Sequence, residues 1–68
     1  LQSEKILQIE MLYKRGEEVF GSSEYFLVWL QAENLALGKT KPQELIGSNF
    51  GISLLMDELT RLEHGILA

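Results

Sequence analysis

The 68-residue chain has no cysteine and only one histidine. Without thiolates it can form neither a disulfide framework nor a cysteine-based zinc site, and one imidazole cannot supply a histidine-based site. The polar residues also lack a combined set of nucleophile, base and orienting group. We therefore expect no catalytic residues, no metal and no cofactor, and the sequence does not predict an enzyme.

Long hydrophobic runs are missing as well. No apolar stretch approaches about 18 residues, and no basic segment followed by an apolar one opens the chain. We expect a soluble, cytoplasmic protein that does not contact a membrane. The chain starts at Leu1 rather than at methionine, and its first residues already look helical. This suggests a fragment or a trimmed product whose N-terminal part is missing.

Clusters of basic residues are also missing. The net charge is −4, and the six lysines and arginines are dispersed among ten acidic residues. Binding to nucleic acid requires a clustered basic face that displaces counterions from phosphates. This fragment is therefore expected not to bind nucleic acid. An acidic domain better suits a protein partner with a positive cleft.

Apolar residues, in contrast, make up 46% of the chain. A domain this small buries only about 60% of the surface of its unfolded chain, so its stability alone is marginal. The apolar content is enough for a core and for some contact with another chain. We therefore predict a homodimer.

Residues 1–20 have the pattern of a long amphipathic helix. Gly16 lies within its apolar stripe, where it either allows a second backbone to approach or breaks the helix, and a continuous helix is favoured. Leu7 and Met11 lie off the stripe, where they cover a neighbour or are exposed. The predicted stripe consists of Ile6, Ile9, Leu12, Tyr13, Val19 and Phe20.

A second helix is predicted after Gly21, which can end the first helix, and Ser22, which can cap the next. Its apolar run, residues 25–30, could form a buried strand, but no second run of this type exists to pair with it. Because this helix is apolar all round, we expect Trp29 and Leu30 to face the core while Tyr25 or Val28 faces a second subunit.

The segment after this helix reads as a turn and a short helix. Asn34 is expected to end the second helix in a left-handed conformation. Thr40 and Gln43 have capping-box spacing around Pro42, which predicts a short helix over residues 42–46. Gly38 to Thr40 superficially echo a phosphate-binding loop, but Glu33 occupies the place of the first glycine of that motif and no strand precedes it.

The last helix is predicted from about Asn49 to His64, with Ser48 as its cap and Gly65 as its stop. Ile52, Leu55, Leu59, Leu62 and Ile66 form its core-facing stripe. The opposite face of this helix carries Phe50, Leu54, Asp57 and Arg61. Together with Tyr25 and Val28 of the second helix, we expect Phe50, Leu54 and Arg61 to form a dimer or partner patch. Glu63 and His64 point about 100° apart and do not suggest acid-base catalysis. The fold class is all-α, a small bundle of about four helices.

The order of several short features carries a resemblance. They are Gly21, Trp29-Leu30, Asn34, Leu37-Gly38, Pro42, Leu45-Ile46, Gly51 and residues 61–66. From Glu18 to Ala68 the chain resembles the C-terminal toxin-binding domain of Xre/MbcA/ParS-type antitoxins. Residues 1–20 would then form a helix at the end of a linker to a missing helix-turn-helix domain, and residues 21–68 the toxin-binding domain. Three positions depart from the family pattern: Phe26 where a small residue is usual, Glu33 where proline is frequent, and Lys39 where a second glycine is frequent.

The resemblance implies an antitoxin that neutralises a RES-type, NAD-consuming toxin by occluding its active site. DNA binding and autorepression would belong to the missing N-terminal domain. The implied toxin-binding residues are Asn34, Leu37, Gly38, Lys39, Glu63, His64, Gly65, Ile66, Leu67 and Ala68. The alternative is the dimerisation or effector domain of a transcriptional regulator that has no toxin partner.

Overall fold

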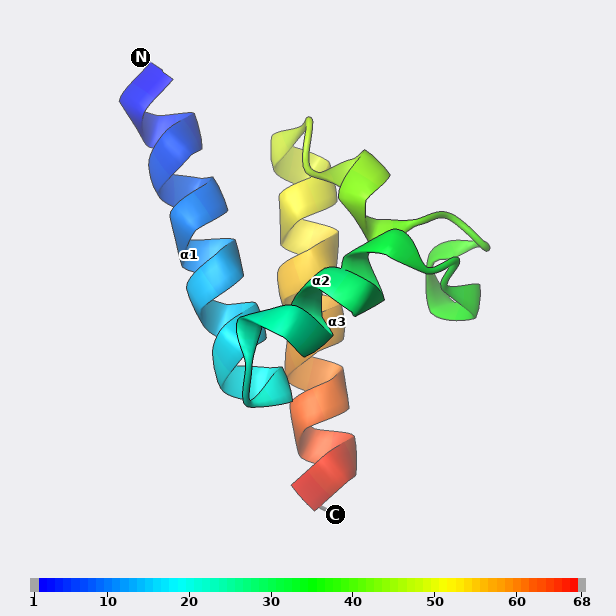
Figure 1. The fold of residues 1–68 in the computed structure, drawn as a ribbon. Coiled ribbons are helices and arrows are strands. Elements are labelled where there is room, and N and C mark those ends of the chain that lie inside the picture. The colour runs from blue at the N-terminus through cyan, green and yellow to red at the C-terminus, as the bar shows by residue number, and fades with distance from the viewer. Residues whose placement is uncertain (1, 68) are drawn as a thin grey trace.

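Three α-helices and two short 3-10 helices make up the computed structural model, which describes the backbone of residues 2–67 and the side chains of residues 4–65. The α-helices are α1 (Gln2–Phe20), α2 (Ser23–Gln31) and α3 (Asn49–Leu67), and the 3-10 helices are η1 (Leu35–Leu37) and η2 (Pro42–Leu45) (Figure 1). The all-α prediction is confirmed for the described residues. The expected fourth helix is instead η2, because four residues starting at a proline leave room only for i→i+3 hydrogen bonds.

The long helices α1 and α3 lie side by side and run in the same direction, and α2 crosses over them (Figure 1). Two polar contacts show this parallel register. The Nζ of Lys5, near the start of α1, donates to the carbonyl of Gly47, just before α3, at 2.5 Å. Toward the C-terminal ends of both helices, Arg15 of α1 contacts Glu63 of α3.

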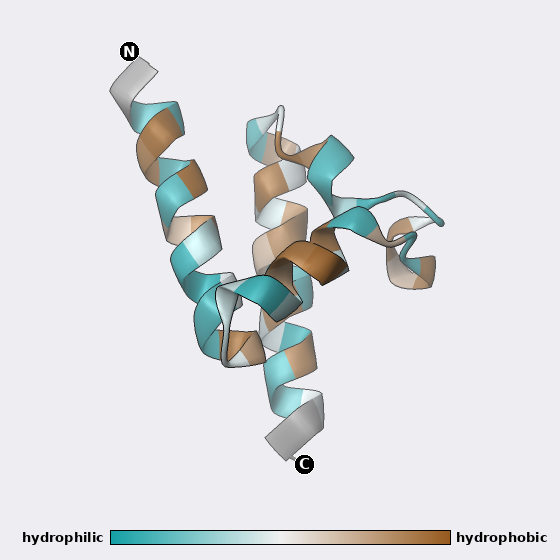
Figure 2. Cartoon of the chain, in the orientation of Figure 1, coloured by the Kyte–Doolittle hydropathy of each residue, from teal (hydrophilic) through white to brown (hydrophobic). Residues whose placement is uncertain are grey.

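The core combines residues from all three α-helices. Its buried members are Leu12, Phe26, Leu30, Leu55 and Leu59. Figure 2 shows how hydrophobic the second half of α2 is. The expected core-facing roles of Trp29, which packs against this core, and of Leu30 are confirmed.

The two predicted apolar stripes fare differently. In α3, Ile52, Leu55 and Leu59 are buried as expected, and Leu62 is half-buried. The side chain of Ile66 lies outside the described residues. In α1, Ile6 and Tyr13 are 57% and 40% exposed, so this part of the predicted stripe is wrong. The reason is that α1 packs on α3 and α2 through Leu12 and Gly16, about a quarter turn away from Ile6.

Gly16 lies within a continuous α1, as favoured, but its close neighbour is a side chain and not a backbone. A Cβ atom at this position would lie 2.3 Å from Cδ1 of Phe26. The Phe26 ring is fully buried against the helix. It contacts Tyr13 edge-on at 5.3 Å between ring centroids and stacks on Trp29 at 5.9 Å. The bulky Phe26 is therefore accommodated by the missing side chain of Gly16.

The helix ends are partly as expected. Gly21 is left-handed, with φ of 81°, and its N–H donates to the carbonyl of Glu17. The hydroxyl of Ser22 accepts from the N–H of Tyr25 at 3.2 Å, and that of Ser48 accepts from the N–H of Gly51 at 2.9 Å. These stops and caps are confirmed.

Three predicted boundaries are wrong. Asn34 does not end α2 in a left-handed conformation, because α2 ends at Gln31 and Asn34 is extended, with φ of −121°. Thr40 does not cap η2, whose N-cap is Lys41 without a side-chain bond. Gly65 does not stop α3, which continues to Leu67. Gly65 has open space around its Cβ position, so no packed neighbour enforces a turn there and the backbone keeps its helical hydrogen bonds.

Candidate functional site

Asn34 organises the first candidate segment, the loop from Asn34 to Thr40. Its side-chain oxygen accepts from the N–H of Ala36 at 2.9 Å. Its carbonyl accepts from the N–H groups of Leu37 at 3.0 Å and Lys39 at 2.8 Å, and its own N–H donates to the carbonyl of Thr40 at 3.1 Å. This network closes the backbone on itself, so the loop is a defined surface element.

The turn of this loop contains two consecutive left-handed residues. Gly38 has a φ of 73° and Lys39 a φ of 65°. Within the described residues, Lys39 is the one residue other than glycine with a positive φ. The conformation explains why a second glycine would fit this position, and it leaves the lysine with a backbone strain that glycine would not have.

The loop presents a small apolar tip. Leu35 is 80% exposed, and Ala36, Gly38 and Lys39 are also exposed. Asn34 and Leu37 are half-buried, and Leu37 packs against the core and holds the loop to the body. In Figure 2 this segment lies at the outer edge of the molecule. Leu35 was not among the predicted site residues, because the resemblance rests on Leu37-Gly38 and the sequence does not show which leucine of the loop is exposed.

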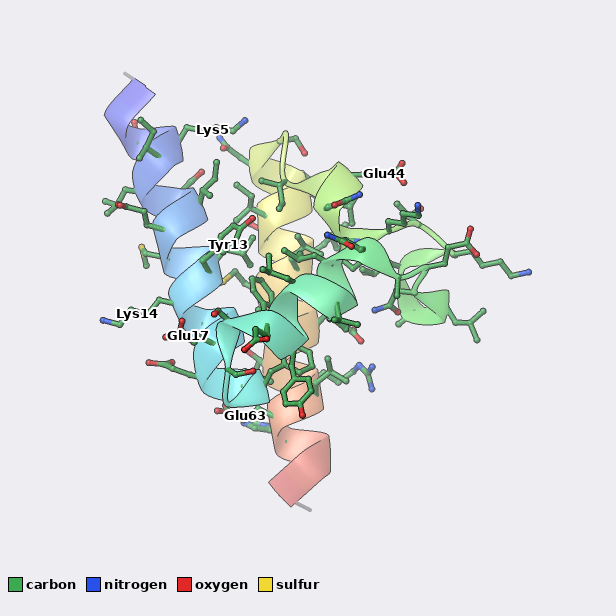
Figure 3. All side chains as sticks on the ribbon, in the orientation of Figure 1. Lys5, Tyr13, Lys14, Glu17, Glu44 and Glu63 are labelled. Carbon is green, nitrogen blue, oxygen red and sulfur yellow. The ribbon has the colours of Figure 1, made fainter. Side chains whose placement is uncertain are left out.

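The second candidate segment is the end of α3. Glu63 accepts two hydrogen bonds from the guanidinium of Arg15, one from Nη2 at 2.5 Å and one from Nη1 at 3.1 Å. Figure 3 shows Glu63 on the side of α3 toward α1. These bonds lower the pKa of Glu63 below its ordinary value and raise the pKa of Arg15. His64 and Gly65 are exposed, and the side chains of residues 66–68 lie outside the described residues. The Glu63 carboxylate thus already has a partner within the chain.

The two segments are not brought together. In Figure 1 the end of α3 extends beyond the other elements, whereas the Asn34–Thr40 loop projects sideways from the far end of α2. One partner that contacted both segments would have to reach from the side of the molecule to its end.

The predicted partner patch separates into two surfaces. Tyr25 and Val28 are 68% and 67% exposed, one turn apart on the outer side of α2. Phe50 is 75% exposed in the first turn of α3, on the same helix as half-buried Leu54 and exposed Arg61. In Figure 1, α2 begins at about the middle of the height of α3, whereas the first turn of α3 lies near the top of the view. Tyr25 and Val28 therefore do not form one continuous patch with Phe50.

Arg61 also has an intramolecular role that sequence analysis missed. Its Nε donates to Oε1 of Glu58 at 3.0 Å, and a second bond joins the same two side chains. Glu58 is 8% exposed, so the arginine neutralises a buried carboxylate. The i,i+3 spacing of the two residues was the signal that could have identified the pair.

A groove of about 270 Å³ lies between parts of α1 and α3. It is lined by Gln8, Met11, Asn49, Ile52, Ser53, Met56 and Asp57. Both methionines of the chain lie here. The side-chain oxygen of Gln8 is buried and has no hydrogen-bond partner among the described residues.

The described part of the chain contains neither a metal-binding cluster nor a membrane-spanning helix. No group of three or more His, Cys, Asp or Glu side chains there could hold a metal ion. No helix among residues 2–67 combines the length and apolar character needed to cross a membrane.

Comparison with known proteins identifies this architecture. The family model of the antitoxin Xre/MbcA/ParS C-terminal toxin-binding domain matches residues 15–65. The match includes the end of α1, all of α2, the loop and α3 up to Gly65. Searches of curated proteins and of solved structures found no similar chain. The resemblance seen in the sequence is thus confirmed, and the chain belongs to the family of Xre/MbcA/ParS antitoxin C-terminal toxin-binding domains.

Proposed function

We propose that the chain is the toxin-neutralising part of an antitoxin of a bacterial type II toxin-antitoxin system, and that it occludes the active site of a RES-type, NAD-consuming toxin. The observation that carries the proposal is the family match over residues 15–65, which includes all of the Asn34–Thr40 loop and residues 63–65 at the end of α3. The net charge of −4 supports it, since an acidic protein suits a cleft that holds an anionic dinucleotide.

In this proposal the Asn34–Thr40 loop is one contact with the toxin. Its hydrogen-bond network fixes the backbone before binding, so little conformational entropy is lost when the complex forms. Leu35 supplies an exposed apolar anchor, and Lys39 a charge beside it. Asn34, Leu37 and Gly38 hold these groups in place.

The second proposed contact is the end of the chain, residues 63–68. His64 and Gly65 are free to meet the toxin, whereas Glu63 could do so only by sharing or leaving Arg15. In this proposal Ile66, Leu67 and Ala68 would enter the dinucleotide cleft of the toxin.

The test measures NAD consumption by the cognate toxin in the presence of the chain. Leu35→Asp and deletion of residues 66–68 should each restore NAD consumption. Circular dichroism should show the helix content of the wild type for Leu35→Asp, and for the truncated protein a loss no larger than the deleted end of α3. Leu27→Asp, a substitution of a 42% exposed residue of α2 outside both segments, serves as the matched control and should leave inhibition intact. Full inhibition by both the Leu35→Asp and the truncated protein would contradict the proposal.

We further propose that the protein acts in the cytoplasm as a homodimer, that it has no catalytic activity of its own, and that this fragment does not bind DNA. The dispersed lysines and arginines support the last point. Residues 1–68 should not retard the DNA of their own promoter even at low salt. A specific gel shift would favour the effector domain of a transcriptional regulator instead.

A further inference from the structure

One exposed face of α1, which reaches the groove at Met11, carries a short stripe outside the matched family segment. Glu4, Leu7, Met11 and Lys14 follow one another at steps of three, four and three residues, so they share one side of the helix. Leu7 and Met11 are 55% and 54% exposed. All four residues precede Arg15, where the matched family segment begins.

The charges of this stripe are complementary to those of a second, antiparallel copy of the same stripe. Glu4 and Lys14 lie equally far from its centre, one at each end, and Leu7 and Met11 lie between them. Both charged side chains are exposed, and within the described residues neither forms an ion pair. Figure 3 shows Lys14 extending away from the bundle. Two copies of α1 placed antiparallel about a two-fold axis would therefore bring Leu7 of each against Met11 of the other and Glu4 of each against Lys14 of the other.

We propose that this stripe of α1 is an isologous interface on which a second copy of the chain packs antiparallel. The inference specifies the surface of the self-association proposed above and does not depend on binding to a toxin. With two apolar residues from each copy the seam is small compared with standard interfaces, so the dimer forms reversibly as the protein concentration rises.

Sedimentation equilibrium of the whole chain from micromolar to millimolar concentration tests the proposal against a monomer mass of 7.7 kDa. The wild type should approach twice this mass. Leu7→Glu should weaken association by about tenfold or more, because it places two carboxylates in the centre of the seam. Leu27→Glu is the matched control on α2, with the same residue type at 42% exposure and outside every predicted patch, and should associate like the wild type.

Charge reversal tests the antiparallel register. Glu4→Lys and Lys14→Glu should each weaken association by about threefold to tenfold, since each places like charges opposite one another twice. The double variant restores both pairs and should recover wild-type association. A wild type that stays monomeric throughout, a Leu7→Glu variant that dimerises normally, or a double variant as weak as the single ones would each overturn the proposal. Inhibition of the toxin, measured separately, tests the other proposal independently.

Discussion

Replacing Gly16 with alanine tests the most specific packing contact of the fold. The added Cβ would lie 2.3, 2.4 and 2.6 Å from three carbon atoms of the Phe26 ring. Carbon atoms in ordinary contact are at least about 3.5 Å apart. The ring cannot easily move away, because it is fully buried and is held by Tyr13, Phe20 and Trp29.

The expected change in stability is the difference of two effects. Overpacking of a well-packed core costs about 1–3 kcal/mol, and three overlapping atoms place this site at the upper end of that range. Alanine gains about 1 kcal/mol over glycine within a helix. The net loss should be about 2 kcal/mol in the free energy of unfolding. For a domain of this size this lowers the melting temperature by about 8–16 °C.

Thermal unfolding followed by circular dichroism measures this loss, and Gly65→Ala supplies the control. Gly65 also lies within a helix, but nothing lies within 4 Å of its Cβ position. That variant should be as stable as the wild type or slightly more stable. If Gly16→Ala were stabilised like Gly65→Ala, the Phe26 ring would not rest on Gly16 and the described core would be wrong.

Three further substitutions test the cap, the turn and the ion pair. Ser22→Ala removes the side-chain acceptor at the start of α2 and should cost about 1 kcal/mol in a urea titration. Lys39→Gly should raise the free energy of unfolding by about 0.5 kcal/mol, because relief of the left-handed strain exceeds the entropic cost of ordering the added glycine. Lys41→Gly is the control: Lys41 has a φ of −74°, so glycine relieves no strain there and should lower the stability. Glu63 has a lowered pKa in the folded state, so its contribution is complete above its ordinary pKa near 4.5 and is lost as the pH falls through the folded value. Glu63→Gln should therefore be less stable than the wild type at neutral pH, and the difference should shrink on acidification; a constant difference would show that the carboxylate charge is not involved.

Features fixed by neighbouring residues could be predicted from the sequence. The caps Ser22 and Ser48 and the left-handed Gly21 depend on short-range hydrogen bonds and dihedral preferences, and the structure has them as expected. The Gly65 stop failed because glycine permits a left-handed turn without requiring it. A helix ends there only if a tertiary contact favours the turn, and sequence spacing does not reveal such a contact.

The direction in which each helix faces was harder to predict. Ile6 belongs to the apolar stripe by its spacing, yet it is exposed because the packing direction of α1 is set by Leu12 and Gly16. The candidate site shows the same limit. The family pattern pointed to the Asn34–Lys39 turn, but only the folded loop distinguishes exposed Leu35 from half-buried Leu37.

The two departures from the family pattern at Phe26 and Lys39 differ in how the fold accommodates them. Phe26 is a larger residue at a buried position, and the missing Cβ of Gly16 on another helix gives it space. Lys39 keeps the left-handed φ that a glycine would adopt, and no substitution elsewhere in the chain can relieve it, because the strain lies between its own Cβ and its own backbone. A change of volume can be compensated across the core, whereas a dihedral requirement cannot. The strain at Lys39 therefore persists in the folded loop, next to the exposed tip that we propose meets the toxin.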